Sequence, residues 1–288
     1  MAFACDWVDA FTDRPFGGNG CVVVHEADGI GLQDRLRLVR ETSLSECAYL
    51  VGSDKADFGA RYYLAEREIP MAGHPTVATV RSLLHRGMVA PSDEFTLEVG
   101  AGVMPIGIGR DGTITMTQAA PVFAAAPAVA EIAAIYGLEP ADFAAEPQVV
   151  STGTPFVIAL LRDKEALKRA SLDERGLAGL RDRTGATWME PFLVTLGGAT
   201  GAGDTFSRLL LPPPMPPEDP FTGSATGCMG AYLWANGLID TPRLVAEQGH
   251  WMGRPGQAQV EVLGPPGAIS GVRVGGHAVV LMSGELLL

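Results

Sequence analysis

Apolar residues alternate with smaller or polar ones near the start of the chain, where Phe3, Cys5 and Trp7 lie two positions apart. A period of two is typical of a β-strand with one buried face. The glycine-rich stretch at 15–20 predicts a tight turn, and the apolar run at 21–24 predicts the next strand. Further short apolar runs predict strands at residues 48–51, 61–64, 149–150 and 156–161.

Segments with the residue spacing of a helix lie between these predicted strands. Leu32, Leu36 and Val39 fall at positions i, i+4 and i+7 among charged residues, which predicts a short amphipathic helix. A second short helix is expected over residues 132–136, where Gly137 would end it.

Two segments of equal length, 73–87 and 223–237, share one pattern 150 positions apart. In each, a glycine turn opens a run with apolar residues at helical spacing, and a second glycine closes it. Coincidence is one explanation, and an internal repeat is the other. A repeat would give two similar halves, each with a buried helix. Two helix N-termini facing one cleft would offer N–H groups and positive dipole ends to an anion.

A domain connection is expected at residues 119–130, which are rich in alanine and proline and low in charge. The expected N-terminal half is therefore 1–118, and the C-terminal half is 119–276. Residues 277–288 are expected to return to the N-terminal half.

Composition limits the classes of function. The 288 residues suit two domains of about 100–150 residues, and 47% apolar residues support sizeable cores. A formal charge of −12 is unfavourable for nucleic-acid binding, which needs clustered Lys and Arg. No apolar run approaches about 18 residues, and the start lacks the pattern of a signal peptide. A cytoplasmic protein without a membrane partner is expected.

Metal and cofactor motifs are lacking in the sequence. The four cysteines are scattered without a CxxC pair, and the five histidines form no HxH or HxxxH. The Gly-rich stretch at 201–204 has no downstream helix pattern that fits a dinucleotide site, so it is read as a turn. We therefore expect no metal and no cofactor.

Four polar residues are candidates for chemistry. Glu46 lies in the apolar stretch 44–50, where desolvation would raise its pKa toward the range useful for proton transfer. His74 lies in the first glycine turn, and Asp219 precedes a proline just before the second. Asn19 lies between two glycines. Each also has a structural reading, as an exposed helix-end glutamate, a capping histidine, an ordinary turn aspartate or a left-handed turn asparagine.

The order of these residues changes their interpretation, because their surroundings resemble the PhzF family of phenazine-biosynthesis proteins. The similar segments run in family order from residue 8 to about residue 262. The most specific is Glu-Asp-Pro-Phe-Thr-Gly-Ser-Ala at 218–225. The others are the opening at 8–19, Leu-Ser-Glu at 44–46, Glu-Ile-Pro-Met-Ala-Gly-His at 68–74, and turns at 151–153 and 253–256.

The resemblance implies a diaminopimelate-epimerase-like α+β fold. Each half would be a barrel-like, mostly antiparallel sheet wrapped around a central helix, with the active site between the halves. It also implies a homodimeric, cofactor-independent isomerase that acts on a small carboxylate-bearing substrate. The family's catalytic residues correspond to Glu46, His74 and Asp219, and its substrate-binding residues to Asn19, Gly73, Gly223 and Ser224.

Three other activities compete with this one. Racemases of the same fold use two cysteines, but Ala72 and Thr222 stand at those positions, which disfavours two-thiol chemistry. A dehydratase or lyase acting on a hydroxylated amino acid derivative could use the same polar residues. A non-catalytic binding protein could keep the fold. Departures from the family pattern at Cys47, Ala72, Gly20 and Pro75 leave the identity of the substrate open.

Overall fold

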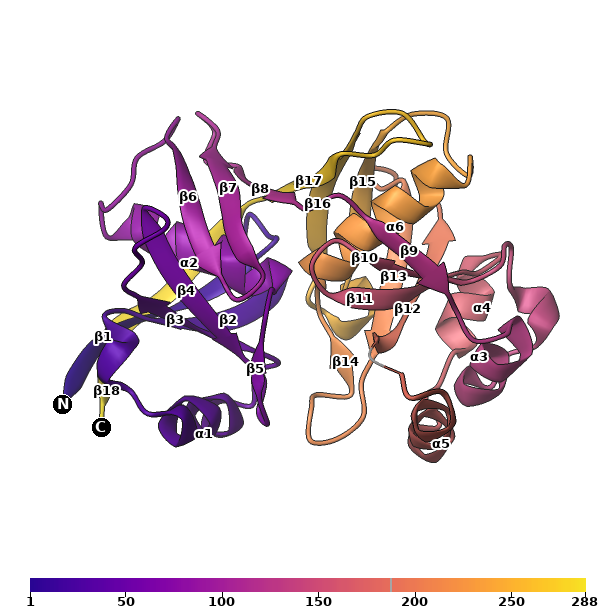
Figure 1. The fold of residues 1–288 in the computed structure, drawn as a ribbon, viewed down its shortest axis with the longest axis horizontal. Coiled ribbons are helices and arrows are strands. Elements are labelled where there is room, and N and C mark those ends of the chain that lie inside the picture. The colour runs from indigo at the N-terminus through magenta and orange to yellow at the C-terminus, as the bar shows by residue number, and fades with distance from the viewer. Residues whose placement is uncertain (187) are drawn as a thin grey trace.

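The computed structural model describes residues 1–186 and 188–288, which form two halves lying side by side (Figure 1). Each half is a curved, mostly antiparallel sheet that wraps around one buried helix. The central helices are α2 (Gly73–His85) and α6 (Gly223–Ala235). Both begin at the glycine that the repeat predicted. The α+β fold class with two similar halves is confirmed.

Besides the central helix α2, the first part of the chain forms eight strands and one further α-helix. The helix is α1 (Leu32–Thr42), preceded by the 3₁₀ turn η1 (Ala27–Gly29). The strands are β1 (Ala2–Ala10), β2 (Asn19–Val24), β3 (Cys47–Val51), β4 (Phe58–Tyr63), β5 (Glu68–Ile69), β6 (Glu94–Val99), β7 (Gly102–Ile108) and β8 (Ile114–Gln118).

The second part repeats this order and adds helices on its outer side. The added elements are α3 (Val129–Tyr136), η2 (Pro140–Asp142), α4 (Lys164–Arg169), α5 (Glu174–Thr184) and η3 (His250–Met252). The strands are β9 (Val122–Ala125), β10 (Gln148–Ser151), β11 (Pro155–Leu160), β12 (Met189–Leu196), β13 (Thr205–Leu210), β14 (Glu218–Asp219), β15 (Arg243–Gln248), β16 (Gly256–Leu263), β17 (Gly271–Gly276) and β18 (Ala278–Leu287).

Strand pairing repeats between the halves. The parallel pairs β2–β3 and β4–β6 of the first half correspond to β11–β12 and β13–β15 of the second. The short strands β5 and β14, each just before a central helix, pair antiparallel with β4 and β13. Because the pairing is the same in both halves, each central helix begins at the corresponding end of its own half.

The chain crosses between the halves twice. Strand β8 pairs with β17 at the join, β9 then pairs with β10, and β18 pairs with β1. The two chain ends consequently lie close together in Figure 1. We propose that the domain boundaries coincide with these crossings, after residues 118 and 276.

The segment 119–130, expected to be only a connection, also contains β9 and the start of α3. All four residues of β9 are exposed, so the strand has no alternating apolar face that a sequence pattern could reveal. Its backbone pairing with β10 forms the strand.

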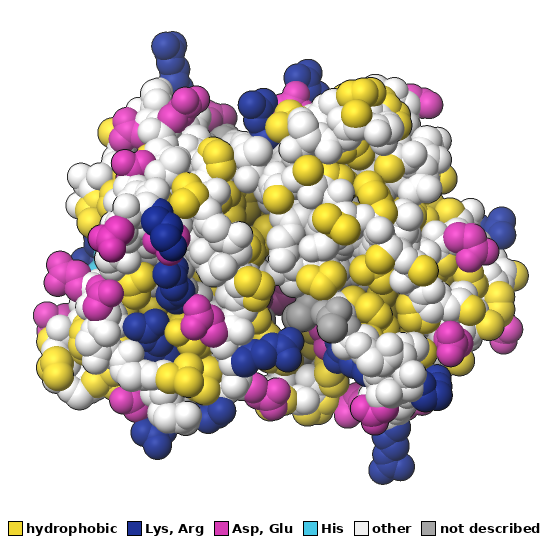
Figure 2. Space-filling model, in the orientation of Figure 1, with side chains coloured by type: hydrophobic (Ala, Val, Ile, Leu, Met, Phe, Trp, Pro, Cys, Tyr) yellow, Lys and Arg dark blue, Asp and Glu magenta, His cyan; other side chains and the backbone are white. Residues whose placement is uncertain are grey.

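On the face shown in Figure 2, acidic and basic side chains are interspersed over both halves. Within residues 1–186 and 188–288, no helix is both long enough and apolar enough to cross a membrane.

Candidate active site

The two central helices begin in direct backbone contact. A Cβ atom added to Gly73 would lie 2.5 Å from the Gly223 carbonyl carbon and 2.5 Å from the Ser224 nitrogen, so no larger residue fits there without a shift. The N-cap residues, Ala72 and Thr222, make no side-chain capping hydrogen bond to either helix. The first-turn N–H groups of a helix lack intrahelical acceptors. Two positive helix ends thus meet at one point, which favours a bound anion.

Three predicted side chains gather beside this contact. His74 lies in the first turn of α2, Asp219 ends β14, and Glu46 precedes β3. His74 Nδ1 lies 3.5 Å from Glu46 Oε2. Asn19, at the start of β2, places its amide nitrogen 3.1 Å from His74 Nδ1 and 2.8 Å from Asp219 Oδ1. Residues up to 200 positions apart are thereby brought into one cluster.

The hydrogen bonds of Asn19 favour one tautomer of His74. Asn19 Nδ2 donates to Asp219 Oδ1 at 2.8 Å and to the Phe221 carbonyl oxygen at 2.9 Å, which fixes the orientation of the amide. The same nitrogen lies 3.1 Å from His74 Nδ1, so its two hydrogens are shared among three partners. An amide nitrogen does not accept hydrogen bonds, and we therefore infer that Nδ1 accepts and that the ring proton is on Nε2. His74 Nε2 is buried and has no hydrogen-bond partner among the described residues. Neutral His74 therefore presents a free N–H donor.

Glu46 is placed to hold and release a proton. Burial raises the pKa of its carboxyl group well above the usual range, and the negative charge of Asp219 raises it further. Its side chain is 16% exposed, yet Oε2 is buried and lacks a hydrogen-bond partner among the described residues. A carboxyl group with a raised pKa can act as an acid when it is protonated, and its ionised form is a stronger base than an ordinary carboxylate.

The other two groups titrate in different ranges. Burial lowers the pKa of His74 to about 3, and the positive charge of Arg254 lowers it further. Burial raises the pKa of Asp219 to about 6, although hydrogen bonds from Thr222 and Asn19 act in the opposite direction. The cluster thus holds a neutral imidazole between two carboxyl groups with raised pKa values.

Gln248, which the sequence interpretation missed, fixes the segment that carries Asp219. Its Nε2 donates to the Asp219 carbonyl oxygen at 2.8 Å, and its Oε1 accepts from the Thr222 backbone nitrogen at 3.0 Å. The Thr222 hydroxyl donates to Asp219 Oδ2 at 2.6 Å. Gln248 is fully buried at the end of β15. A buried glutamine near a strand end carries no local motif, so only the fold identifies it.

An aromatic pair lies beneath the helix starts, in the contact between the two halves, which we call the seam. The rings of Phe11 and Phe221, one from each half, stack with their centroids 4.4 Å apart, and both are fully buried. Phe11 has a backbone φ of 62°, which is uncommon for a residue with a side chain. A Cβ atom on Gly223 would lie 2.6 Å from the Phe11 ring. The ring therefore packs directly under the helix contact.

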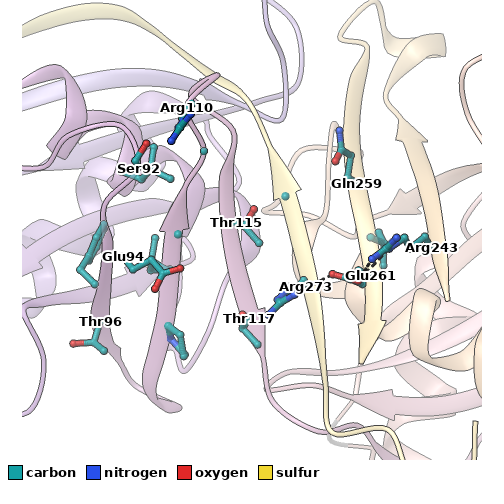
Figure 3. A pocket seen from close by; sticks show the side chains of 18 of the residues that line it. Ser92, Glu94, Thr96, Arg110, Thr115, Thr117, Arg243, Gln259, Glu261 and Arg273 are labelled. Atoms are coloured by element: carbon teal, nitrogen blue, oxygen red, sulfur yellow. Dashed lines mark hydrogen bonds and ion pairs between the residues drawn. The ribbon is translucent and has the colours of Figure 1, made fainter. Parts of the chain in front are cut away.

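A large groove lies elsewhere. It has a volume of about 1240 Å³ and is lined by β6, β7 and β8 of the first half and by β15, β16 and β17 of the second. Figure 3 shows Glu94 and Arg110 on one side and Arg243, Glu261 and Arg273 on the other. Glu261 already binds both Arg243, at 2.6 Å, and Arg273, at 3.1 Å. None of the predicted catalytic residues is among the residues that line the groove. The candidate active site is therefore placed at the helix starts, where buried polar atoms lack partners.

Among the described residues, no three His, Cys, Asp or Glu side chains gather as a metal site would require. The cysteines are free. Burial raises the pKa of Cys47 to about 12 and that of Cys228 to about 11, so both thiols stay protonated at neutral pH.

Comparisons with known proteins agree with this architecture. The family described as phenazine biosynthesis-like protein, PhzC-PhzF, matches residues 8–284. A Salmonella typhimurium protein named uncharacterized isomerase YddE is 32% identical, with 96% of each chain covered. The trans-2,3-dihydro-3-hydroxyanthranilate isomerase of Pseudomonas aeruginosa is 28% identical, with 98% of each chain covered. A crystal structure of a PhzF-family phenazine biosynthesis protein from Bacillus anthracis has a TM-score of 0.85, 27% identity and full coverage of both chains. The chain belongs to the PhzC-PhzF family and, like its named relatives, is an isomerase.

Proposed function

We propose that this isomerase moves a proton on a small carboxylate-bearing substrate, with Glu46 as the single acid and base. One observation carries the proposal. Glu46 Oε2 and His74 Nε2 are both buried and unpaired among the described residues, beside a helix contact that favours an anion. Buried polar atoms without partners are costly in a folded protein, so two of them at one point indicate a place for a ligand.

The substrate carboxylate would lie at the two helix starts. Backbone N–H groups of Gly73, Gly223 and Ser224 are the expected donors, because they belong to the first turns of α2 and α6. Asn19 was predicted to bind substrate directly. Its amide nitrogen already faces three acceptors, so we propose that it orients His74 and Asp219 instead.

The proton transfer then needs one carboxyl group. Ionised Glu46 takes a proton from one carbon, and the electron pair of that C–H bond enters the unsaturated system of the substrate. Glu46 then returns the proton to another carbon, so the product is an isomer. His74 Nε2–H donates a hydrogen bond to the substrate, and Asp219 binds polar groups of the substrate. Between the two steps the proton stays on Glu46, whose side chain is 16% exposed, so part of it exchanges with solvent before it is returned.

Two-thiol racemisation has little support in this site. The N-cap positions of the two helices hold Ala72 and Thr222, and the Thr222 hydroxyl is already bonded to Asp219. A hydroxyproline epimerase from Agrobacterium vitis and a probable proline racemase from Agrobacterium radiobacter are each 14% identical and share the fold alone. A Pseudomonas aeruginosa protein described as a predicted epimerase is 29% identical, so the argument against two-thiol chemistry rests on the residues at positions 72 and 222.

Replacing Glu46 with Gln tests the proposal. The probe is trans-2,3-dihydro-3-hydroxyanthranilate, the compound in the name of the Pseudomonas aeruginosa relative. In D₂O, mass spectrometry follows deuterium entry and product mass. We expect Glu46→Gln to lower the exchange rate by about 10²- to 10⁴-fold, the usual contribution of an acid–base group.

The matched control is Glu41→Gln, an exposed glutamate five positions earlier. It should exchange at the wild-type rate. Unchanged exchange in Glu46→Gln would remove Glu46 from the mechanism, and a product lighter by one water would indicate dehydration in place of isomerisation.

A further inference from the structure

Arg254 reaches from one half of the protein into the other. It follows η3 in the turn that leads into β16 of the second half. Its guanidinium donates to three acceptors of the first half. Nε bonds the Gly18 carbonyl oxygen at 2.9 Å, and one terminal nitrogen bonds the Gly17 carbonyl oxygen at 2.9 Å and Asp9 Oδ1 at 2.7 Å.

Asp9 completes this contact from within the first half. It lies in β1 and is fully buried, and its second oxygen accepts a hydrogen bond from the Phe16 backbone nitrogen at 2.7 Å. The backbone adds a bond in the reverse direction, from the Gly18 nitrogen to the Pro255 carbonyl oxygen at 3.0 Å. The loop at residues 16–18 is thus fixed from both halves, and a charge-assisted, hydrogen-bonded Arg–Asp pair is strong for its size.

Asn19 follows this loop directly. It is 2% exposed, and its amide nitrogen contacts His74 Nδ1, Asp219 Oδ1 and the Phe221 carbonyl oxygen. A displacement of the loop would move this nitrogen relative to all three. The loop is therefore mechanically connected to both groups that the proposed function assigns to the substrate.

We propose that Arg254 and Asp9 are a positioning pair that holds Asn19 across the seam and thereby fixes the Nε2–H tautomer of His74 and the orientation of Asp219. Neither member of the pair touches the reacting atoms. The inference concerns the geometry of His74, and its importance for catalysis rests on the proposed function.

Electrostatics support the same pair. The charged groups around His74 come from four elements: Glu46 before β3, Asp219 with its neighbour Glu218 on β14, Asp9 on β1, and Arg254 before β16. The positive charge of Arg254 helps to keep the pKa of His74 low. Its removal should let the imidazole protonate at higher pH.

Nitrogen NMR of ¹⁵N-histidine-labelled protein tests the inference without any substrate. His74→Gln identifies the His74 signals among the five histidines. In the wild type we expect His74 to be neutral, with the proton on Nε2, and to show no titration between about pH 5 and 8, as its low pKa requires. In Arg254→Gln we expect a mixture of the two tautomers and a titration at higher pH. Arg254→Lys keeps the charge but loses the planar fork, so its tautomers should mix with a smaller change in titration.

Arg86 supplies a matched control. It also binds a fully buried aspartate of β1, Asp6, at 2.7 Å, and the two arginine side chains are 27% and 31% exposed. Arg86→Gln should lower thermal stability to a similar degree and leave the His74 signals at their wild-type positions. A folded Arg254→Gln protein with wild-type His74 signals would overturn the inference. Equal changes in Arg86→Gln would overturn it too, because they would reflect general loosening.

Kinetics with the dihydro-hydroxyanthranilate probe add a second readout. Arg254→Gln should lower kcat by about 10²-fold, the size expected for misplacement of about 1 Å, and change KM much less. A loss confined to KM would contradict a positioning role. If the wild type fails to exchange deuterium with the probe while the His74 signals respond as expected, the positioning pair stands and the proposed function fails.

Discussion

At the scale of single residues, the site combines groups whose titration is displaced in opposite directions. Burial raises the pKa values of Glu46 and Asp219 and lowers that of His74. Burial therefore favours the uncharged form of all three side chains. Ionising these groups in the folded protein lowers its stability, as is common for acid–base groups in active sites.

Asp219→Asn should increase the free energy of unfolding at neutral pH. Burial raises the pKa of Asp219 from 3.8 to about 6, so the folded state binds this proton more tightly than the unfolded state. The stabilising contribution of the protonated group is complete below the unfolded pKa and is lost as pH rises through the folded one. At about 1.4 kcal/mol for each unit, the gain in the variant is up to about 3 kcal/mol above pH 7.

Urea unfolding at pH 4 and pH 7.5 measures this difference. The gain should be present at pH 7.5 and nearly absent at pH 4. Asp240→Asn, at an exposed aspartate, is the control and should have little effect at either pH. An equal gain at both pH values would show that Asp219 titrates normally.

Short motifs determined which site residues the sequence could reveal. Glu46, His74 and Asp219 each lie in a local pattern, and the structure brings all three together. Asp9 and Arg254 are 245 positions apart, and neither segment alone indicates an ion pair. Their contact exists only after both halves have folded.

At the scale of elements, the contact between α2 and α6 sets the geometry of the site. Gly73 and Gly223 allow the two helix starts to meet backbone to backbone. The glycine positions therefore decide how closely two positive helix ends approach.

Gly73→Ala should separate these helix starts. The added Cβ would meet backbone atoms of Gly223 and Ser224 at 2.5 Å, and backbone cannot rotate away. Overpacking of this kind costs about 1–3 kcal/mol. Thermal unfolding should show the loss, and deuterium exchange with the probe should fall.

Gly179→Ala is the contrasting control. This glycine lies inside α5, where an added Cβ would meet only the Arg183 side chain at 3.4 Å. Alanine is the better helix former, so this variant should gain about 0.5–1 kcal/mol. A similar gain in Gly73→Ala would contradict the close contact of the helix starts.

Elements were predictable where a local pattern defined them. The paired glycines predicted both central helices with their first residues, because glycine turns and apolar spacing act within one segment. The strand expected at 61–64 extends over Phe58–Tyr63. Strand β9 was missed because its exposed residues form a strand only through pairing with β10.

At the scale of the whole molecule, the last strand of the chain completes the sheet of the first half. Strand β18 lies along β1, although every strand of the second half separates the two in sequence. The homodimer expected from the family resemblance stays a prediction.

Deletion of residues 277–288 should destabilise the first half more than the second. It removes β18, which is paired with β1 from Ala2 to Ala10. Hydrogen–deuterium exchange should show lost protection in β1 and β2 and smaller changes in β11 to β13. Deletion of Leu288 alone is the control. Uniform loss of protection across both halves would show that they unfold as one unit.

The crossing of the chain also has a consequence for biosynthesis. Strand β1 is among the first segments to leave the ribosome, and its partner β18 is translated after all strands of the second half. The first half therefore waits with an open sheet edge while the second half is being made. An unpaired edge is a template for unwanted pairing. During that interval, nascent-chain chaperones would have a defined surface to protect, and slow translation of residues 119–276 would prolong its exposure.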